Sequence, residues 1–242
     1  MENVSYVVLS YQMALQRHLD ILANNVANMT STAFRSERPL FQEFLVTADD
    51  GSTTSYVEDV GLLRNTNPGS IQQTGNTLDV AISGEGFFVV DTLDGERYTR
   101  NGNWRLDEFG QIVVGTGNPL VDDAGLPIVI DANDGAITIR ADGTVLSEAG
   151  PIGQLRIVSF EDEQAMQKMG DGLFDAGGQI ARPATNFSVL QGMLETSNVN
   201  GVVEMTLMME VANAYRTTAQ ITSTVDDLRR RAIQTIGQVL SV

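Results

Sequence analysis

The side chains that most often perform catalysis are scarce in this sequence. His18 is the only histidine, and there are no cysteines. A Ser-His-Asp or Cys-His site needs a histidine beside its nucleophile, and no partner motif accompanies His18. Disulfides and cysteine-ligated metals are excluded as well. We therefore interpret His18 as a packing residue at the edge of a helix face, and we expect no catalytic residue, no bound metal and no cofactor.

Carboxylates are abundant, and they are the remaining candidates for chemistry. Acidic pairs within Asp122-Asp123 and Glu161-Asp162-Glu163 could act as the acid and base of a glycosidase. Because the chain has 31 acidic residues, such neighbours arise by coincidence and usually face water. Gly84-Glu85-Gly86 lacks the spacing of a phosphate-binding loop and indicates a bend between strands. We expect no small-molecule substrate.

The net charge of −16 argues against binding to nucleic acid, which needs clustered Lys and Arg. The whole excess of acids lies in residues 40–199, whereas the two ends together hold 7 acidic and 7 basic residues. The middle is therefore solvated and self-repelling, and the neutral ends can pack against copies of themselves. No apolar run is long enough to span a membrane, and the first residues do not have the pattern of a cleaved secretory signal.

Glycine and proline divide the chain into helical ends and a turn-rich middle. No glycine precedes Gly51, and all six prolines lie between Pro39 and Pro183. The first segment carries apolar residues at steps of three and four, close to an 11-residue repeat. They are Val4, Val8, Tyr11, Leu15, Leu19, Leu22, Val26 and Met29.

The last segment carries a heptad-like seam instead. It consists of Leu207, Val211, Ala214, Thr218, Ile221, Val225, Leu228 and Ala232. Asn200 is a plausible N-cap for this helix, and the arginines at 229–231 are best explained as a solvated helix end. We expect the two helices to pack subunits together through Tyr11, Leu15, Leu19, Leu22, Val26, Leu207, Val211, Tyr215, Ile221, Val225 and Leu228.

The middle of the chain has short apolar runs separated by turn signals, which is typical of antiparallel strands. Phe87-Phe88-Val89-Val90 is the clearest strand, and Asp94-Gly95 marks a turn. Asn101-Gly102, between Tyr98-Thr99-Arg100 and Trp104-Arg105-Leu106, predicts a hairpin with a type I′ turn.

The predicted fold is therefore α+β, with the two terminal helices packed as a coiled-coil-like stem and a central all-β domain of short antiparallel strands. We expect an N-terminal helix in residues 1–32, an extended connector in 33–78, a β-rich outer domain in 79–172, a second connector in 173–199 and a C-terminal helix in 200–242.

Several stretches, in order along nearly the whole chain, carry a family signature. Ala23-Asn24-Asn25-Val26-Ala27-Asn28, continuing to Phe34-Arg35, resembles the N-terminal motif of bacterial flagellar rod and hook proteins. Thr77-Leu78-Asp79-Val80 through Val90 resembles the segment that enters their outer domain. Leu194-Glu195-Thr196-Ser197-Asn198-Val199-Asn200 is similar to their C-terminal signature. The motif residues are Asn24, Asn25, Asn28, Phe34, Asn198 and Asn200.

The resemblance implies a structural subunit of the flagellar basal-body rod that transmits motor torque. Within the family, the opening segment and Val225-Asp226-Asp227 are most similar to members of the proximal rod. The implied partners are copies of the chain itself, neighbouring rod proteins and the flagellar type III export apparatus. The implied location is the periplasm-spanning rod. Ala33 departs from the family motif, which usually has glycine at this position, so the turn there is expected to be strained if it needs a positive φ.

Other functions remain open on the sequence alone. Within the family, the alternative is a distal rod or hook-like subunit. Outside the family, the acidic pairs leave open a cell-wall glycosidase, and the helical ends leave open a surface adhesin with a coiled-coil stalk. The glycosidase predicts cleavage of peptidoglycan, and the adhesin predicts a trimer of parallel helices.

Overall fold

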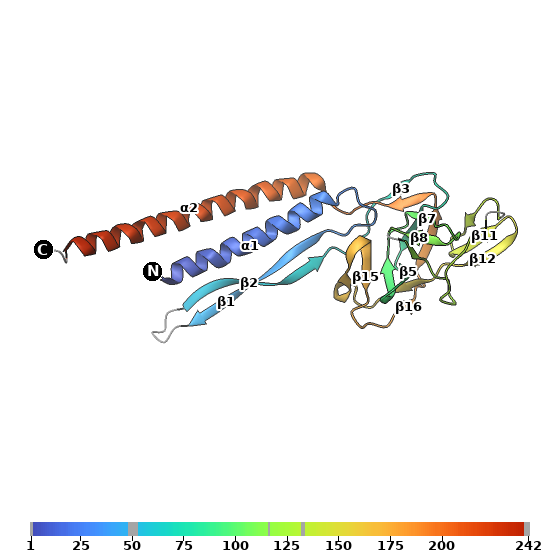
Figure 1. Ribbon diagram of the computed structural model, residues 1–242, viewed down its shortest axis with the longest axis horizontal. Coiled ribbons are helices and arrows are strands. Elements are labelled where there is room, and N and C mark those ends of the chain that lie inside the picture. The colour runs from blue at the N-terminus through green and yellow to red at the C-terminus, as the bar shows by residue number, and fades with distance from the viewer. Residues whose placement is uncertain (1, 48–52, 116, 132–133, 240–242) are drawn as a thin grey trace. The chain divides into compact units, whose positions relative to one another are not determined.

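A computed structural model describes residues 2–47, 53–115, 117–131 and 134–239 (Figure 1). The chain forms two compact units. The first contains residues 1–27, 36–65 and 199–242, and the second contains residues 28–35 and 66–198. None of the helices in the described residues is both long enough and apolar enough to cross a membrane.

The first unit consists of two helices and a long β-hairpin, with α1 between α2 and the hairpin (Figure 1). Its elements are α1 Glu2–Ala27, β1 Glu37–Thr47, β2 Thr53–Arg64 and α2 Gly201–Val239. Asn200 caps α2, because its Oδ1 accepts the N–H of Val203 at 3.3 Å, and Glu204 lies in the positively polarised first turn.

A β-bulge bends the hairpin in its first half. Leu40 pairs with Gly61 and Phe41 pairs with Asp59, so Val60 is the extra residue. Gly61 has a φ of 149°, and its N–H is held by Oδ1 of Asp59 at 3.2 Å. Such a bulge increases the local twist, which lets a flat two-stranded ribbon follow the cylinder of a helix.

The predicted coiled-coil-like stem is wrong. Coiled coils need a continuous seam on both helices, but here the apolar face of α1 is shared between α2 and the β1–β2 hairpin. Among the described residues, the buried hydrophobic cluster between the two helices is small and consists of Leu15, Leu22 and Val211. The α2 side chains from Ala219 to Thr235 are half-buried or exposed. The β1–β2 hairpin occupies residues that we expected to be an extended connector. Because the hairpin was not expected, the whole apolar face of α1 was assigned to pairing with the other helix.

The second unit consists of short antiparallel strands and two 3₁₀ turns, η1 Glu163–Ala165 and η2 Gly170–Gly172. Its strands are β3 Ile71–Gln73, β4 Val80–Gly84, β5 Phe87–Thr92, β6 Gly95–Thr99, β7 Trp104–Leu106, β8 Ile112–Val114, β9 Asn118–Pro119, β10 Thr138–Ile139, β11 Thr144–Ser147, β12 Gly150–Gln154, β13 Ile157–Ser159, β14 Gln167–Lys168, β15 Leu173–Asp175, β16 Arg182–Pro183, β17 Phe187–Gln191 and β18 Met193–Glu195.

The largest sheet of the second unit has the order β14-β15-β6-β5-β13-β16, and strand β5 is buried on both of its faces. Phe88 and Val90 belong to one hydrophobic cluster, and Phe87 and Val89 belong to another. Because successive side chains of a strand point to opposite faces, this sheet separates two cores. The unbroken apolar run of β5 in the sequence reflects this double burial.

The hairpin predicted around Asn101-Gly102 is also wrong. β6 pairs with β5 through the turn that contains Asp94, whereas β7 pairs with β8 in another sheet. A Cβ added to Gly102 would lie 1.5 Å from the carbonyl oxygen of Val80. Gly102 is therefore needed because the backbone at Val80 lies too close for a side chain. The Asn-Gly pair alone does not tell this role of glycine from its role in a turn.

Candidate assembly surface

Six of the predicted packing residues lie together in the first unit. Leu15, Leu22 and Val211 are buried, and Leu19, Leu207 and Tyr215 pack against them. Asn25 near the end of α1 bonds Glu204 in the first turn of α2, and the two helices run in opposite directions (Figure 1). This cluster joins the two helices within one chain.

The other five predicted residues leave part or most of their surface uncovered. Val26 and Val225 are half-buried, whereas Tyr11, Ile221 and Leu228 are exposed. Ile221 and Val225 line a shallow groove on α2 together with three polar neighbours, Thr217, Gln220 and Thr224. Their role in joining subunits remains a prediction.

The structure adds exposed apolar residues that periodicity did not identify. On α1 they lie beside the predicted stripe, and on β1 and β2 they fall in the stretch that we expected to be a connector. They include Tyr6, Leu9, Met13, Phe44, Leu45, Leu62 and Leu63. Together with the uncovered stripe residues, they leave large apolar side chains exposed on all four elements of the first unit. We call these exposed side chains the apolar surface of the first unit, and exposure of this kind is often found at protein–protein interaction sites.

Asn25 explains one family motif in physical terms. Its side chain is 0% exposed, and its amide pairs with the backbone of Glu37 as another peptide would. Nδ2 donates to the Glu37 carbonyl at 2.8 Å, and Oδ1 accepts the Glu37 N–H at 3.0 Å. Nδ2 also donates to Oε2 of Glu204 at 3.0 Å. One side chain thus ties α1 to both β1 and α2, and a buried amide needs such complete bonding.

Most of the remaining motif residues also contact other parts of the second unit. Oδ1 of Asn28 accepts the hydroxyl of Ser31, and the Lys168 ammonium lies 4.2 Å from the centre of the Phe34 ring. Asn198 donates its N–H to the carbonyl of Phe34 and its Nδ2 to the carbonyl of Asn67. Asn24 is exposed.

A buried ion cluster in the second unit was missed by the sequence analysis. The carboxylate of Glu195 lies 2.9 Å from Nη2 of Arg35 and 2.9 Å from Nε of Arg100, and all three side chains are buried. Arg100 also donates to the carbonyls of Ile82, Gly84 and Gly86. The residues are up to 160 positions apart in sequence, so the available signal was the place of Arg35 and Glu195 inside two family motifs.

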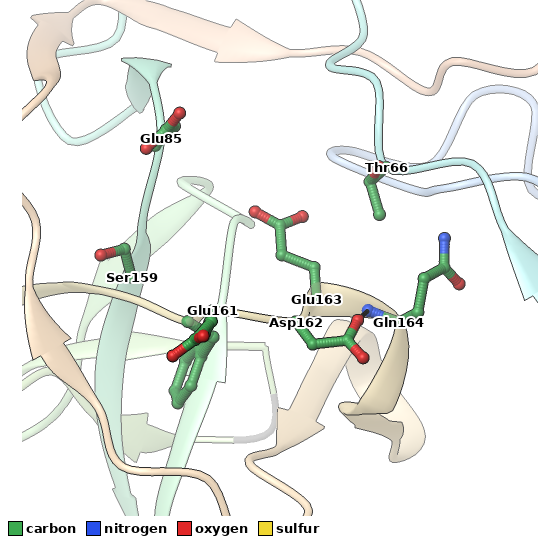
Figure 2. A pocket seen from close by; sticks show the side chains of 8 residues that line it. Thr66, Glu85, Ser159, Glu161, Asp162, Glu163 and Gln164 are labelled. Carbon is green, nitrogen blue, oxygen red and sulfur yellow. Dashed lines mark hydrogen bonds between the residues drawn. The ribbon is translucent and has the colours of Figure 1, made fainter.

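The acidic run Glu161-Asp162-Glu163 lines a pocket of the second unit together with Glu85, Ser159 and Thr66 (Figure 2). Two of its carboxylates have ordinary structural roles. Oδ1 of Asp162 caps the 3₁₀ turn η1 by accepting the N–H of Gln164 at 2.9 Å, and Glu161 pairs with Arg182 at the surface. Within the described residues, no group of three or more acidic or histidine side chains is arranged to hold a metal ion.

His18 is half-buried on α1, with its ring edge-on to Phe41 at a centroid distance of 6.4 Å. Burial lowers the pKa of its imidazole below the ordinary value of 6.5. The negative charge of Glu204 opposes this lowering, and the positive charge of Arg38 adds to it. These neighbours fit the role of a packing residue.

Exposed apolar side chains on both terminal helices, together with motif residues that mostly bond within the chain, are typical of a structural assembly protein. Two family models match the sequence: the flagellar hook protein FlgE/F/G D1 domain over residues 81–147, and the flagellar basal body rod FlgEFG protein C-terminal region over residues 190–235.

Whole-chain comparisons give the same result. The chain is 37% identical to the flagellar basal-body rod protein FlgF of Caulobacter vibrioides, over 99% of this chain and all of the relative. It is 30% identical to FlgF of Escherichia coli, over 98% of this chain and 99% of the relative. It is 29% identical to FlgG of Bacillus subtilis, over 94% of this chain and 97% of the relative.

The chain belongs to the family of flagellar basal-body rod proteins. It is a structural protein and not an enzyme. The expected resemblance to proximal-rod members of the family is confirmed by the relatives named FlgF.

Proposed function

We propose that this protein is a structural subunit of the proximal flagellar rod that polymerises through its two terminal helices and transmits motor torque. The observation that supports this most is the apolar surface of the first unit. Met13 on α1 is 66% exposed, and Ile221 on α2 is 49% exposed. Neighbouring subunits would cover these side chains and gain the free energy of apolar burial.

The wider setting follows from family membership. We expect the partners to be copies of this chain and neighbouring rod and hook proteins in the basal body. We further propose that the flagellar type III apparatus exports the chain and that the assembled rod spans the periplasm. Packed interiors deform little, so a tube lined by close-packed helices would resist twisting and carry torque.

Substitutions at exposed positions test assembly without disturbing the fold. Ile221→Asp and Met13→Asp place a charge on the apolar surface, and burying that charge at a subunit interface is unfavourable. We expect both variants to have the circular dichroism of the wild type as monomers. In a strain that lacks the chromosomal copy, we expect neither of them to restore intact basal bodies or swimming.

Asn213→Asp is the matched control, because it adds the same charge at an exposed polar position of α2. It should restore both rods and swimming. Normal rods in cells carrying Ile221→Asp and Met13→Asp would refute assembly through this surface, and normal rods in the strain without the chain would refute the proposed function itself.

A further inference from the structure

The chain passes between its two units four times, and the ends of these passages in the second unit are bonded to one another. The passages occur at residues 27–28, 35–36, 65–66 and 198–199. Within the second unit they lead to three short segments, 28–35, 66–70 and 195–198. We define the bonded group formed by these segments and Arg100 as the Glu195 node.

Backbone and side-chain bonds connect each segment of the Glu195 node to the others. Arg35 donates from Nη1 to the carbonyl of Thr66 at 2.8 Å. Asn198 donates its N–H to the carbonyl of Phe34 at 3.1 Å and its Nδ2 to the carbonyl of Asn67 at 2.7 Å. The three segments therefore cannot separate without breaking hydrogen bonds.

Glu195 is the centre of this node. Its side chain bonds to segments 28–35 and 66–70, and its backbone carbonyl bonds to segment 28–35. Its Oε1 lies 2.9 Å from Nη2 of Arg35 and accepts the N–H of Gly69 at 3.1 Å. Its carbonyl accepts the N–H of Ala33 at 2.8 Å. The side chain is 3% exposed, so water does not screen or replace these bonds.

Arg100 connects the node to the sheets behind it. Nε of Arg100 pairs with Oε2 of Glu195 at 2.9 Å, and its Nη atoms donate to the carbonyls of Gly86, Ile82 and Gly84. Ile82 and Gly84 belong to β4, and Gly86 directly precedes β5 in the double-faced core. A continuous path of charge-assisted bonds thus runs from the chain passages to the core of the second unit.

We infer that the Glu195 node is a torque-bearing joint, in which Glu195 and Arg100 transfer load from the four chain passages to the β-sheets. Buried ion pairs contribute little net stability compared with apolar residues of the same shape, but their geometry is narrowly defined. A node that must keep its own shape under load needs defined geometry more than it needs extra stability. The inference rests on the proposed function as a rod subunit.

Glu195→Gln tests the node, because it keeps the size of the side chain and removes the charge that faces both arginines. In the purified protein we expect hydrogen exchange of the amides in 28–35 and 66–70 to be at least about tenfold faster, since a bond to a charged group is lost. In cells we expect rods in normal number. Swimming should match the wild type in dilute medium and fall below it as medium viscosity, and therefore motor load, increases.

Glu161→Gln is the matched control, because it removes a charge from an exposed ion pair of the same unit. It should leave both exchange and swimming unchanged. If Glu195→Gln does not fold, the milder Asn198→Ala, which deletes the side-chain bond to Asn67, is judged by the same measurements.

Three outcomes separate the possibilities. Wild-type exchange in the folded variant would refute the bonded node. Faster exchange with wild-type swimming at every viscosity would refute its mechanical role while leaving the rod function intact. Normal rods in a strain without the chain would instead refute the proposed function.

Discussion

Ala33 has a φ of 55°, in the left-handed region that glycine adopts without strain. The side chain is buried, and the N–H is fixed by the carbonyl of Glu195 at 2.8 Å, so the residue cannot relax into another conformation. For residues other than glycine this conformation costs roughly 1–2 kcal/mol. The departure from the family motif noted in the sequence thus lies at a strained position.

We predict that Ala33→Gly stabilises the protein by up to about 1 kcal/mol, because relief of strain exceeds the greater entropy of the unfolded chain. Urea unfolding of both proteins measures the difference. Ala232→Gly, at an exposed position inside α2, should have the opposite sign and cost about 1 kcal/mol. Equal unfolding midpoints for Ala33→Gly and the wild type would show that the relief of strain does not exceed the entropic cost of the glycine.

His18 predicts a pH dependence with a definite sign. Its pKa is lowered in the folded protein, so between the folded and unfolded values the unfolded chain binds more protons. Stability should therefore fall as pH drops below about 6.5 and should level off once pH is below the folded pKa. The effect is small, because the ring is only half-buried and Glu204 partly offsets the lowering.

The measurement is the urea midpoint of the wild type and of His18→Gln between pH 7.5 and 5.5, a range above the pKa of ordinary carboxyl groups. We expect the wild type to lose stability over this range and the variant to lose less. Parallel curves for the two proteins would exclude a contribution from His18.

At the scale of elements, the seam between α1 and α2 depends on Leu22, which is 2% exposed at the centre of the helix cluster. Leu22→Asp removes apolar contacts and buries a charge, so we expect a destabilisation of at least about 3 kcal/mol. Urea unfolding should show the loss, and cells carrying the variant should not swim. Leu9→Asp, at an exposed position of the same helix, should leave monomer stability within about 0.5 kcal/mol of the wild type.

Some elements could be predicted from the sequence because one physical pattern dominates each of them. The absence of glycine and proline around Leu15 and Leu22 indicated a helix, and the apolar run from Phe87 to Val90 indicated a buried strand. The β1–β2 hairpin could not be predicted in this way. A two-stranded ribbon is marginal by itself, and this one is supported by its packing on α1, a tertiary effect with no local signal.

The residues of the candidate site also divide into those that a local pattern predicts and those that depend on tertiary contacts. The apolar stripe on α2 identified Val211 and Ile221 through helical spacing, but spacing does not tell which of them is covered within the chain. Glu195 lies in a family motif, but its position in the sequence does not indicate that Arg100 lies beside it. Their burial depends on contacts between distant segments, so the structure was needed to identify the node.

For the whole molecule, the two units differ in how much of their apolar surface is covered within one chain. The second unit has two buried hydrophobic clusters. Among its described residues the first unit has a single small cluster, and the α2 side chains from Ala219 to Thr235 are half-buried or exposed. Local stability should follow this difference, because segments with few buried contacts open with little free energy.

We therefore predict that brief digestion of the monomer by subtilisin leaves a fragment from about residue 66 to about residue 198, identified by intact mass. The cuts should appear first in α2 beyond Thr218, which is the last buried residue among the described residues of that helix. Cleavage follows the population of open helix, so it should be rapid there and slow within the sheets.

In isolated basal bodies the same segment should resist digestion, since neighbouring subunits would cover Ile221 and Leu228. Equal resistance of α2 in the monomer and in the basal body would mean that assembly adds no cover to this helix, and the helix would then not be part of the subunit interface.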